Sequence, residues 1–286
     1  MSLRALRALT ALLAGATINA LQAQTPTRSH LRDRLQVSVS GAVLTYATDF
    51  RIDAGDGSPG TELDPEDDLG MPSTVVQAHF GVRFRPGRRH ELEFGYLLAR
   101  RAGDHVLTDT IIVGDTTFAA GLRTESDIAS DNATLTYRFA FHLRARHEIG
   151  ATIGLGTLLF RTDIKAVSGS TSAGPDTTIV PYAQTNSLTV PTAALGLYGR
   201  MQAGQAWYFE ADARALFFTI ERITVNVIDV GVSTRYFVSS WLGLQAAYTF
   251  SGVSAAVDPR PGAGSSFSGR LKYGLHAVRI GIVATK

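Results

Sequence analysis

The 286-residue chain contains no cysteine and no long apolar run after its N-terminus. The first absence excludes disulfide bonds, thiolate metal sites and a cysteine nucleophile. The second excludes a membrane-spanning helix, which needs about 20 predominantly apolar residues. Hydrophobic residues nevertheless make up 45% of the chain, so they must follow another pattern.

Net charge is also nearly absent. The chain carries 27 Lys and Arg against 25 Asp and Glu, and two of the basic residues, Arg4 and Arg7, precede the short apolar run Ala8–Ala20. This arrangement, with Ala23 as the cleavage point, is typical of a secretory signal peptide over residues 1–23. Its removal leaves 25 basic and 25 acidic residues, so the charge gives no reason to expect a nucleic-acid partner.

The apolar residues recur at every second position. From Trp207 to Phe217 the odd positions are mainly apolar, whereas Glu210, Asp212 and Arg214 lie between them. A period of two indicates a β-strand with two different faces. Its length matches the roughly 9–11 residues that a tilted strand needs to cross a bilayer, and exceeds the usual five or six of a globular sheet. We therefore expect a transmembrane strand.

The same alternation predicts about ten such strands along the chain. They are Leu35–Val43, Val76–Phe84, His90–Leu98, Ala133–Phe141, Ile149–Leu159, Leu188–Met201, Trp207–Phe217, Ile228–Tyr236, Leu242–Phe250 and His276–Ile282.

The connections between the predicted strands alternate in length. Long ones cover Thr48–Pro72, Gly103–Gly121, Val167–Asn186 and Ser251–Phe267, and the others are short, with Glu221–Ile223 as the exception to the alternation. Long loops at one end and short turns at the other are typical of bacterial outer-membrane barrels. We predict an all-β, single antiparallel up-and-down transmembrane β-barrel over residues 35–286. A periplasmic linker at residues 24–34 precedes it, and the location is the bacterial outer membrane.

Charged residues fix which face of each strand meets lipid, because an Arg facing lipid at mid-depth costs about 2–4 kcal/mol. The charged face must therefore be the lumen. Opposite charges in a narrow lumen should pair, since an unpaired buried charge is costly. This predicts a structural salt-bridge network that fills the lumen, and a selective ion path is the alternative. The predicted lumen charges are Arg83, Glu91, Glu93, Arg138, Arg200, Glu210, Asp212, Arg214, Asp229, Arg235 and Arg279.

The first long loop is strongly acidic. Five carboxylates offer the oxygen ligands that divalent cations prefer, and cation binding that bridges lipopolysaccharide phosphates is one interpretation. Their spacing does not match an EF-hand, so a solvated loop is the favoured interpretation. The residues are Glu62, Asp64, Glu66, Asp67 and Asp68.

Catalytic patterns are weak. A lipid hydrolase needs a serine beside a histidine on the outer face, and neither His90 nor His276 has a serine at an obvious partner position. A barrel protease needs Asp and His together near the outer rim, but the adjacent pair Asp104–His105 would point to opposite faces of a strand. We expect no enzymatic activity and no cofactor.

The segment Gly60–Gly70, with Gly-Thr, an acidic run and a closing Asp-Leu-Gly, resembles the first long loop of an uncharacterised family of bacterial outer-membrane β-barrels. Arg88–His90 and Gly114–Phe118 extend the similarity. More loosely, the chain is similar to small OmpA- and OmpW-like barrels. The resemblance implies the fold and location and no activity.

These observations favour a monomeric outer-membrane barrel with a structural or surface-interaction role. A narrow porin-like channel for ions or small solutes is the alternative, and a barrel enzyme acting on lipid or peptide is the least favoured. The expected partners are outer-membrane lipid, lipopolysaccharide and the barrel-assembly machinery.

A closed barrel in the outer membrane should keep its shape in detergent until it is boiled. We predict that unboiled protein migrates differently from boiled protein on a gel, and that it sediments with outer-membrane fractions. Recovery as a soluble periplasmic protein with one gel mobility would contradict the fold and the location together.

Overall fold

The computed structural model describes residues 29–166, 183–221, 223–258 and 268–286. The predicted signal peptide lies outside these residues. The long strands are β1 (Leu35–Ile52), β3 (Thr74–Phe84), β4 (His90–Leu97), β8 (Arg123–Leu143), β9 (His147–Ala166), β10 (Ala183–Ala203), β11 (Trp207–Ile220), β12 (Ile223–Phe237), β13 (Leu242–Val257) and β14 (Gly269–Thr285).

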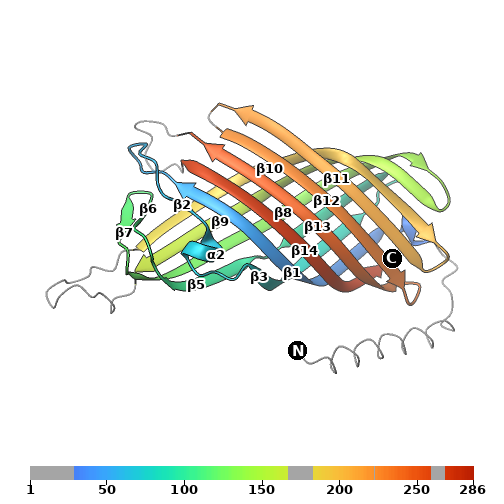
Figure 1. Ribbon diagram of the computed structural model, residues 1–286. Helices are drawn as coiled ribbons and strands as arrows, with labels where there is room; N and C mark the ends of the chain where they lie inside the picture. Colours follow the sequence, from blue (N-terminus) through green and yellow to red (C-terminus); the bar gives the residue numbers. More distant parts are fainter. Residues whose placement is uncertain (1–28, 167–182, 222, 259–267) are drawn as a thin grey trace, which may run out of the picture.

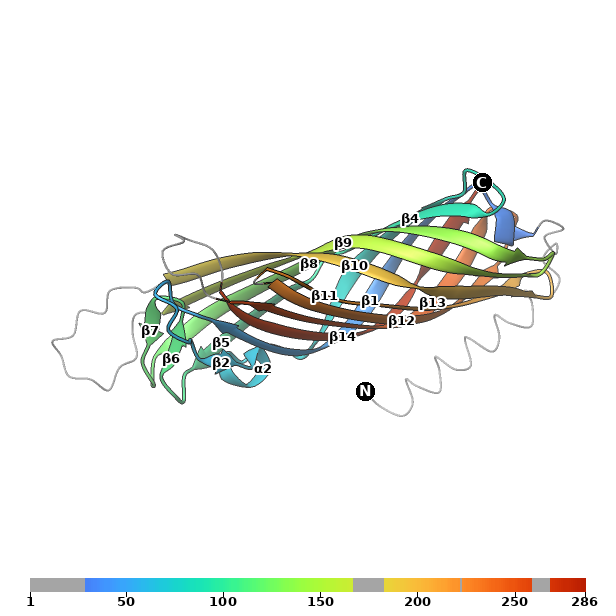
Figure 2. The same ribbon diagram turned by 90° about the horizontal axis from the view of Figure 1, so that it is seen from above.

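These ten strands close into an antiparallel ring. Each pairs with its neighbour in chain order, and β14 returns to pair with β1 from Gln36↔Thr285 to Ile52↔Gly269. Figure 1 shows the tilted strands from the side, and Figure 2 shows the same barrel from above. Because β14 pairs with β1, the ring has no unpaired terminal strand, which a bilayer would not tolerate. The predicted transmembrane up-and-down barrel of about ten strands is confirmed.

One sector of the wall is built differently. β4 gives way to β5 (Arg100–Val106), which continues along β8 but does not pair with β3. The first long loop occupies this sector, with β2 (Glu62–Leu63) paired to the end of β1 and the one-turn α2 (Pro65–Asp68) beside it. Gly103 of β5 lies so close to Leu69 O that an added Cβ would be 2.2 Å from it. The loop is therefore part of the barrel wall.

The strands are much longer than a membrane crossing requires. β8 and β10 have 21 residues each, against about 9–11 for one span. The extra length lies at the long-loop end. For that reason the strands begin or end beyond the predicted limits: β10 starts at Ala183 instead of Leu188, β1 reaches Ile52, and β13 reaches Val257.

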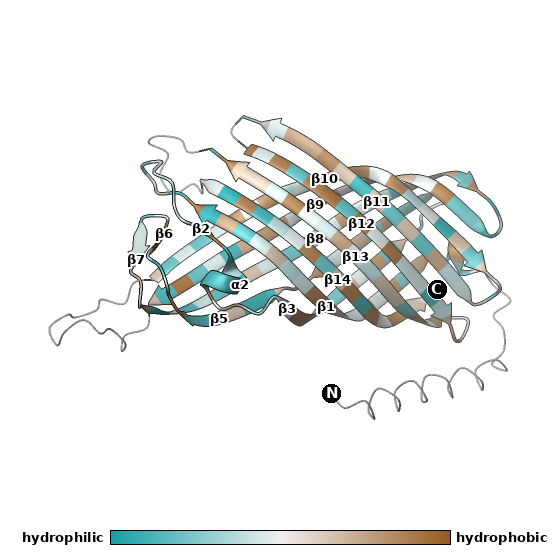
Figure 3. Ribbon diagram, in the orientation of Figure 1, coloured by the Kyte–Doolittle hydropathy of each residue, from teal (hydrophilic) through white to brown (hydrophobic). Residues whose placement is uncertain are grey.

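The apolar face changes sides along the longest strands, among them β1 and β9. In the half of β1 near the short turns, the outward residues Val37, Val39 and Val43 are apolar. Towards the long-loop end, the inward residues Leu44 and Phe50 are apolar and buried. β9 changes in the same way. Figure 3 shows the resulting mixture of hydrophobic and hydrophilic positions along the strands. The change marks the height at which the surroundings of the barrel pass from lipid to water.

The buried apolar core consequently lies inside the long-loop end of the barrel. It gathers residues of the wall, of the first loop and of the hairpin formed by β6 (Ile111–Val113) and β7 (Thr116–Phe118). Phe118 and Leu69 are fully buried in it. We call this cluster the apolar plug. No described helix has the length and hydropathy needed to cross a membrane.

The opposite end, at the short turns, is covered by residues 29–34. The 3₁₀ turn η2 (His30–Arg32) inserts His30, which stacks on Phe237 with the ring centroids 3.7 Å apart. Tyr208 Oη accepts a hydrogen bond from the His30 backbone N–H at 2.9 Å. Leu31 joins Tyr208, Phe237 and Val283 in a small apolar cluster. We call residues 29–34 the N-terminal cap.

The change of faces predicts where a charge is tolerated on the outside of one strand. Leu195 and Ala183 both face outward on β10, but Leu195 lies in the apolar belt and Ala183 lies beyond it. Leu195→Arg should destabilise the assembled barrel by about 2–4 kcal/mol, and Ala183→Arg by about 0–1 kcal/mol. Urea unfolding of both variants in lipid vesicles measures the difference. Equal costs would mean that the belt continues to the long-loop end.

Candidate functional site

The lumen in the membrane-spanning part contains a layer of charged side chains centred on Glu210. Arg83 Nη1 donates to Glu210 Oε2 at 3.1 Å and Arg200 Nε donates to the same oxygen at 3.0 Å. Arg138 and Arg235 also form ion pairs with Glu210. Four arginines from four other strands therefore converge on one buried carboxylate of β11. We call this cluster and its partners the charged layer.

Glu91 and Glu148 extend the charged layer towards the short turns. Arg200 Nη1 and Arg85 Nη2 donate to Glu91 at 2.8 and 2.7 Å, and Arg85 also pairs with Glu148 at 3.1 Å. The sequence analysis missed Arg85 and Glu148, because they lie just outside the predicted strand limits. Arg85 is two positions from Arg83, and Glu148 is two positions from Gly150. Residues two apart on a strand share a face, so the strand period could have placed both side chains in the lumen.

Aromatic packing holds the charged layer in place. The Tyr198 hydroxyl donates to Glu148 Oε1 at 2.5 Å, and its ring lies 5.2 Å and 5.1 Å from the guanidinium carbons of Arg138 and Arg200. Gly150 makes room for this ring, because a Cβ there would lie 2.4 Å from it.

The structure brings all of the predicted lumen charges to the interior of one barrel, in two groups. Glu93 joins the charged layer through Arg83 and Arg138, at 3.1 and 2.8 Å. The second group lies nearer the long-loop end, and its ion pairs are longer. Its members are Asp212, Arg214, Asp229 and Arg279.

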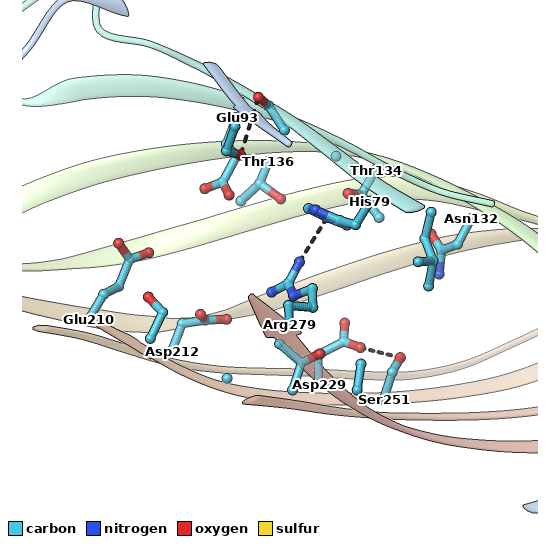
Figure 4. Close-up of a pocket in the computed structure, with 18 of the residues that line it drawn as sticks. His79, Glu93, Asn132, Thr134, Thr136, Glu210, Asp212, Asp229, Ser251 and Arg279 are labelled. Atoms are coloured by element: carbon cyan, nitrogen blue, oxygen red, sulfur yellow. Dashed lines mark hydrogen bonds between the residues drawn. The ribbon is translucent and has the colours of Figure 1, made fainter. Parts of the chain in front are cut away.

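The second group lines a cavity of about 210 Å³ between the charged layer and the apolar plug, with both polar and apolar residues in its lining, which we call the chamber. In Figure 4, Arg279 points towards His79 and Ser251 towards Asp229; these contacts measure 2.8 and 2.5 Å. Arg214 lies 3.6 and 3.8 Å from Asp212 and Asp229. Such a volume accommodates several waters, which would hydrate these incompletely paired groups.

The apolar plug closes the lumen above the chamber. Leu275, Val227 and Val253 line the chamber and also belong to the buried apolar cluster. From here to the long loops the inward residues are largely apolar, with Arg101 lying over the Tyr46 ring at 4.2 Å as a buried exception. The lumen therefore has four levels: cap, charged layer, chamber and plug.

The acidic loop uses several of its carboxylates within the fold. Asp64 caps α2 by accepting from the Glu66 and Asp67 backbone N–H groups, and Asp68 Oδ2 accepts from the Asp64 N–H at 2.7 Å. Glu62 lies 3.7 Å from Lys272 Nζ. Among the residues that the structure describes, no group of three or more acidic or histidine side chains is arranged to hold a metal ion.

Glu66 points to Arg101 of β5 and helps to hold the loop in the wall. Its surroundings are partly dehydrated. Burial raises the pKa of its carboxyl above the usual range, although the Arg101 charge opposes this.

The histidines weighed as catalytic candidates make other contacts. On the outer face, His90 and His276 lie 2.7 and 2.8 Å from the hydroxyls of Tyr137 and Tyr248 on neighbouring strands. Asp104 forms an ion pair with Arg123, which lowers the pKa of its carboxyl through a hydrogen bond.

Asp104 is exposed, whereas the neighbouring His105 is half-buried. The His105 side chain packs against Gly70 of the first loop, where an added Cβ would lie 3.2 Å from the His105 Cβ. The two are therefore not combined as an acid–base pair.

No family model matches the chain, and neither does any curated protein sequence. Among solved structures, the outer membrane protease OmpT of Escherichia coli aligns with 92% of this chain and 100% of its own, with a TM-score of 0.51 and 11% identity. The fold is that of an outer-membrane β-barrel. Identity this low supports the shared fold alone.

Two other outer-membrane proteins align with lower scores. The toluene transporter TodX of Pseudomonas putida covers 93% of each chain with a TM-score of 0.35 and 11% identity. The attachment invasion locus protein Ail of Yersinia pestis covers 88% of this chain and 99% of its own with a TM-score of 0.33 and 9% identity. The closed barrel with an apolar outer belt is an architecture of the bacterial outer membrane, the location expected from the sequence.

Removal of the central carboxylate should destabilise the barrel strongly, because four arginines would lose their common partner. We predict that Glu210→Ala lowers the free energy of unfolding by about 3–5 kcal/mol. Glu62→Ala, which removes an exposed carboxylate 3.7 Å from Lys272, should change it by about 0.5 kcal/mol or less. Urea unfolding in the same vesicles compares the two, and similar effects would mean that the charged layer contributes little.

Proposed function

We propose that the protein is an occluded outer-membrane barrel with a structural or surface-interaction role. The observation that carries this proposal is the succession of obstructions along the lumen. A solute would have to pass the N-terminal cap, the ion pairs around Glu210 and the apolar plug. Barrels of about eight strands are filled by side chains, and an aqueous channel is expected at 16–18; ten strands lie near the filled end.

The plug supports occlusion more strongly than the charged layer does. Charged side chains can exchange partners and admit water, but a largely apolar cluster that fills the barrel offers few polar groups to hydrate a passing ion. Leu158 and Ile164 of β9, Phe118 of the hairpin and Leu69 of the first loop are all buried at about 1% exposure or less. An ion crossing this region would face a large desolvation cost.

The part of the barrel beyond the membrane supports a surface role. Its outer face carries both signs of charge, and several are paired: Arg100 with Asp131, Arg123 with Asp104, and Arg161 with Asp163 at 3.1 Å. The wall there is β-sheet from β8 through β14 to β1, and the first loop fills the sector between β1 and β5. This rigid polar rim would present the long loops away from the membrane surface.

The chamber favours a second candidate function, a narrow gated channel. Its lining groups Asp212, Asp229, Arg214 and Arg279 are incompletely paired and suited to contact an ion or a small polar solute. In this candidate the cap and the plug would have to move aside during transport.

Planar-bilayer recordings of the refolded full chain decide between the two. An occluded barrel should give no steady conductance steps under conditions in which a general porin conducts. A gated channel should give steps whose ion selectivity changes in Asp212→Asn and Asp229→Asn, because both side chains line the chamber. Such selectivity changes would overturn the occluded barrel. Their absence in a silent but heat-modifiable wild-type protein would support it.

A further inference from the structure

The outer surface of the barrel contains an apolar groove within the lipid-facing belt. The groove has a volume of about 780 Å³ and crosses six strands, from β9 to β14. Its floor is low because small side chains face outward there, namely those of Gly199, Ala211 and Ala246. Ile280 stands at its far end with 71% of its surface exposed. Nothing lies within 4 Å of the position that a Gly199 Cβ would occupy.

The groove rises obliquely from the short-turn end. Its lining follows the strand register from His147 to Met201, Phe209, Thr234, Ala246 and Ile280. His147 is the first residue of β9, whereas Ile280 lies well inside β14. With strands about 4.8 Å apart, the six strands span about 24 Å. The groove thus connects the membrane interface with the middle of the apolar belt.

A basic turn lies at the interfacial end of the groove. The β8–β9 turn exposes Arg144 and Arg146 directly before His147, and it is closed by a hydrogen bond from the Arg144 N–H to the His147 carbonyl at 2.9 Å. The nearest acidic residue in the sequence, Glu148, is buried in the lumen against Arg85 and Tyr198. The arginine charges at this turn are therefore available to an anion outside the barrel.

We propose that the groove and the basic turn form one binding site for an anionic glycerophospholipid. An acyl chain would lie over Gly199, Ala211 and Ala246, and the phosphate would lie at Arg144 and Arg146. The complementarity of charge at one end and of apolar surface along the rest identifies the ligand class. Basic groups at a membrane surface attract anionic headgroups, and the groove keeps the chain next to them.

Native mass spectrometry of the full chain, released from micelles containing phosphatidylglycerol or phosphatidylcholine with the same acyl chains, tests this site. The wild type should retain one phosphatidylglycerol under activation that removes phosphatidylcholine. Gly199→Leu should lose the bound lipid because its side chain fills the groove. Gly41→Leu is the matched control: Gly41 also faces outward in the belt, on β1, with nothing within 4 Å of its Cβ position.

The headgroup end is tested by charge removal. The double variant Arg144→Gln/Arg146→Gln should retain about tenfold less phosphatidylglycerol. Arg34→Gln/Arg88→Gln removes the same charge from exposed positions outside the groove and should retain the wild-type amount. Heat-modifiable mobility establishes that each variant is folded.

Three results would overturn the proposal. The first is equal retention of both lipids, or of neither, by the wild type. The second is equal retention by Gly199→Leu and Gly41→Leu, or by the two double arginine variants. The third is a dimer that is lost in Gly199→Leu, since a second copy of the chain would then be the occupant of the groove.

Discussion

The structure depends on one constraint: the longest strands are surrounded by lipid over one part of their length and by water over the other. In lipid, the apolar residues must face outward and the polar ones inward; in water, the arrangement reverses. On β1 this reversal takes place between Val43, which faces outward, and Leu44, which faces inward. The charged layer and the apolar plug follow from the same rule. Where lipid surrounds the wall, the polar residues face inward and form the charged layer; where water surrounds it, the apolar residues face inward and form the plug.

The membrane-spanning part could be predicted from the sequence because its rule is simple. Outward apolar residues alternate with inward polar ones, and a one-residue slip of Trp207–Phe217 would put Glu210, Asp212 and Arg214 into lipid. The pairing of Glu210 with Arg200 and Arg235 was also accessible, since the three belong to strands expected to be neighbours or nearly so. The pairing of Arg83 and Arg138 with the same carboxylate could not be predicted, because these arginines reach Glu210 across the lumen from strands that are not its neighbours.

The part beyond the membrane was harder to predict for a physical reason. There the strands remain extended, but Thr45, Asp49 and Arg51 face water on β1, while Ser, Thr and Asn dominate the start of β10. Such composition is also typical of loops, so the sequence analysis ended the strands too early. The alternation continues with the opposite face apolar, as at Leu158, Phe160 and Ile164 of β9, and a search for both phases would have found it. The plug could not be assembled from the sequence, because it brings the first loop and the β6–β7 hairpin into contact with distant strands.

The N-terminal cap bears on the order in which the barrel can assemble. Residues 29–34 precede every strand, yet many of their contacts are with late ones: Tyr208 of β11, Phe237 at the end of β12, and Val283 and Thr285 of β14. Others reach the end of β3, the β8–β9 turn and β10. The contacts with Val283 and Thr285 cannot form until β14 is in place. The complete set of cap contacts therefore forms only after the last strand has been added, although residues 29–34 precede the first strand.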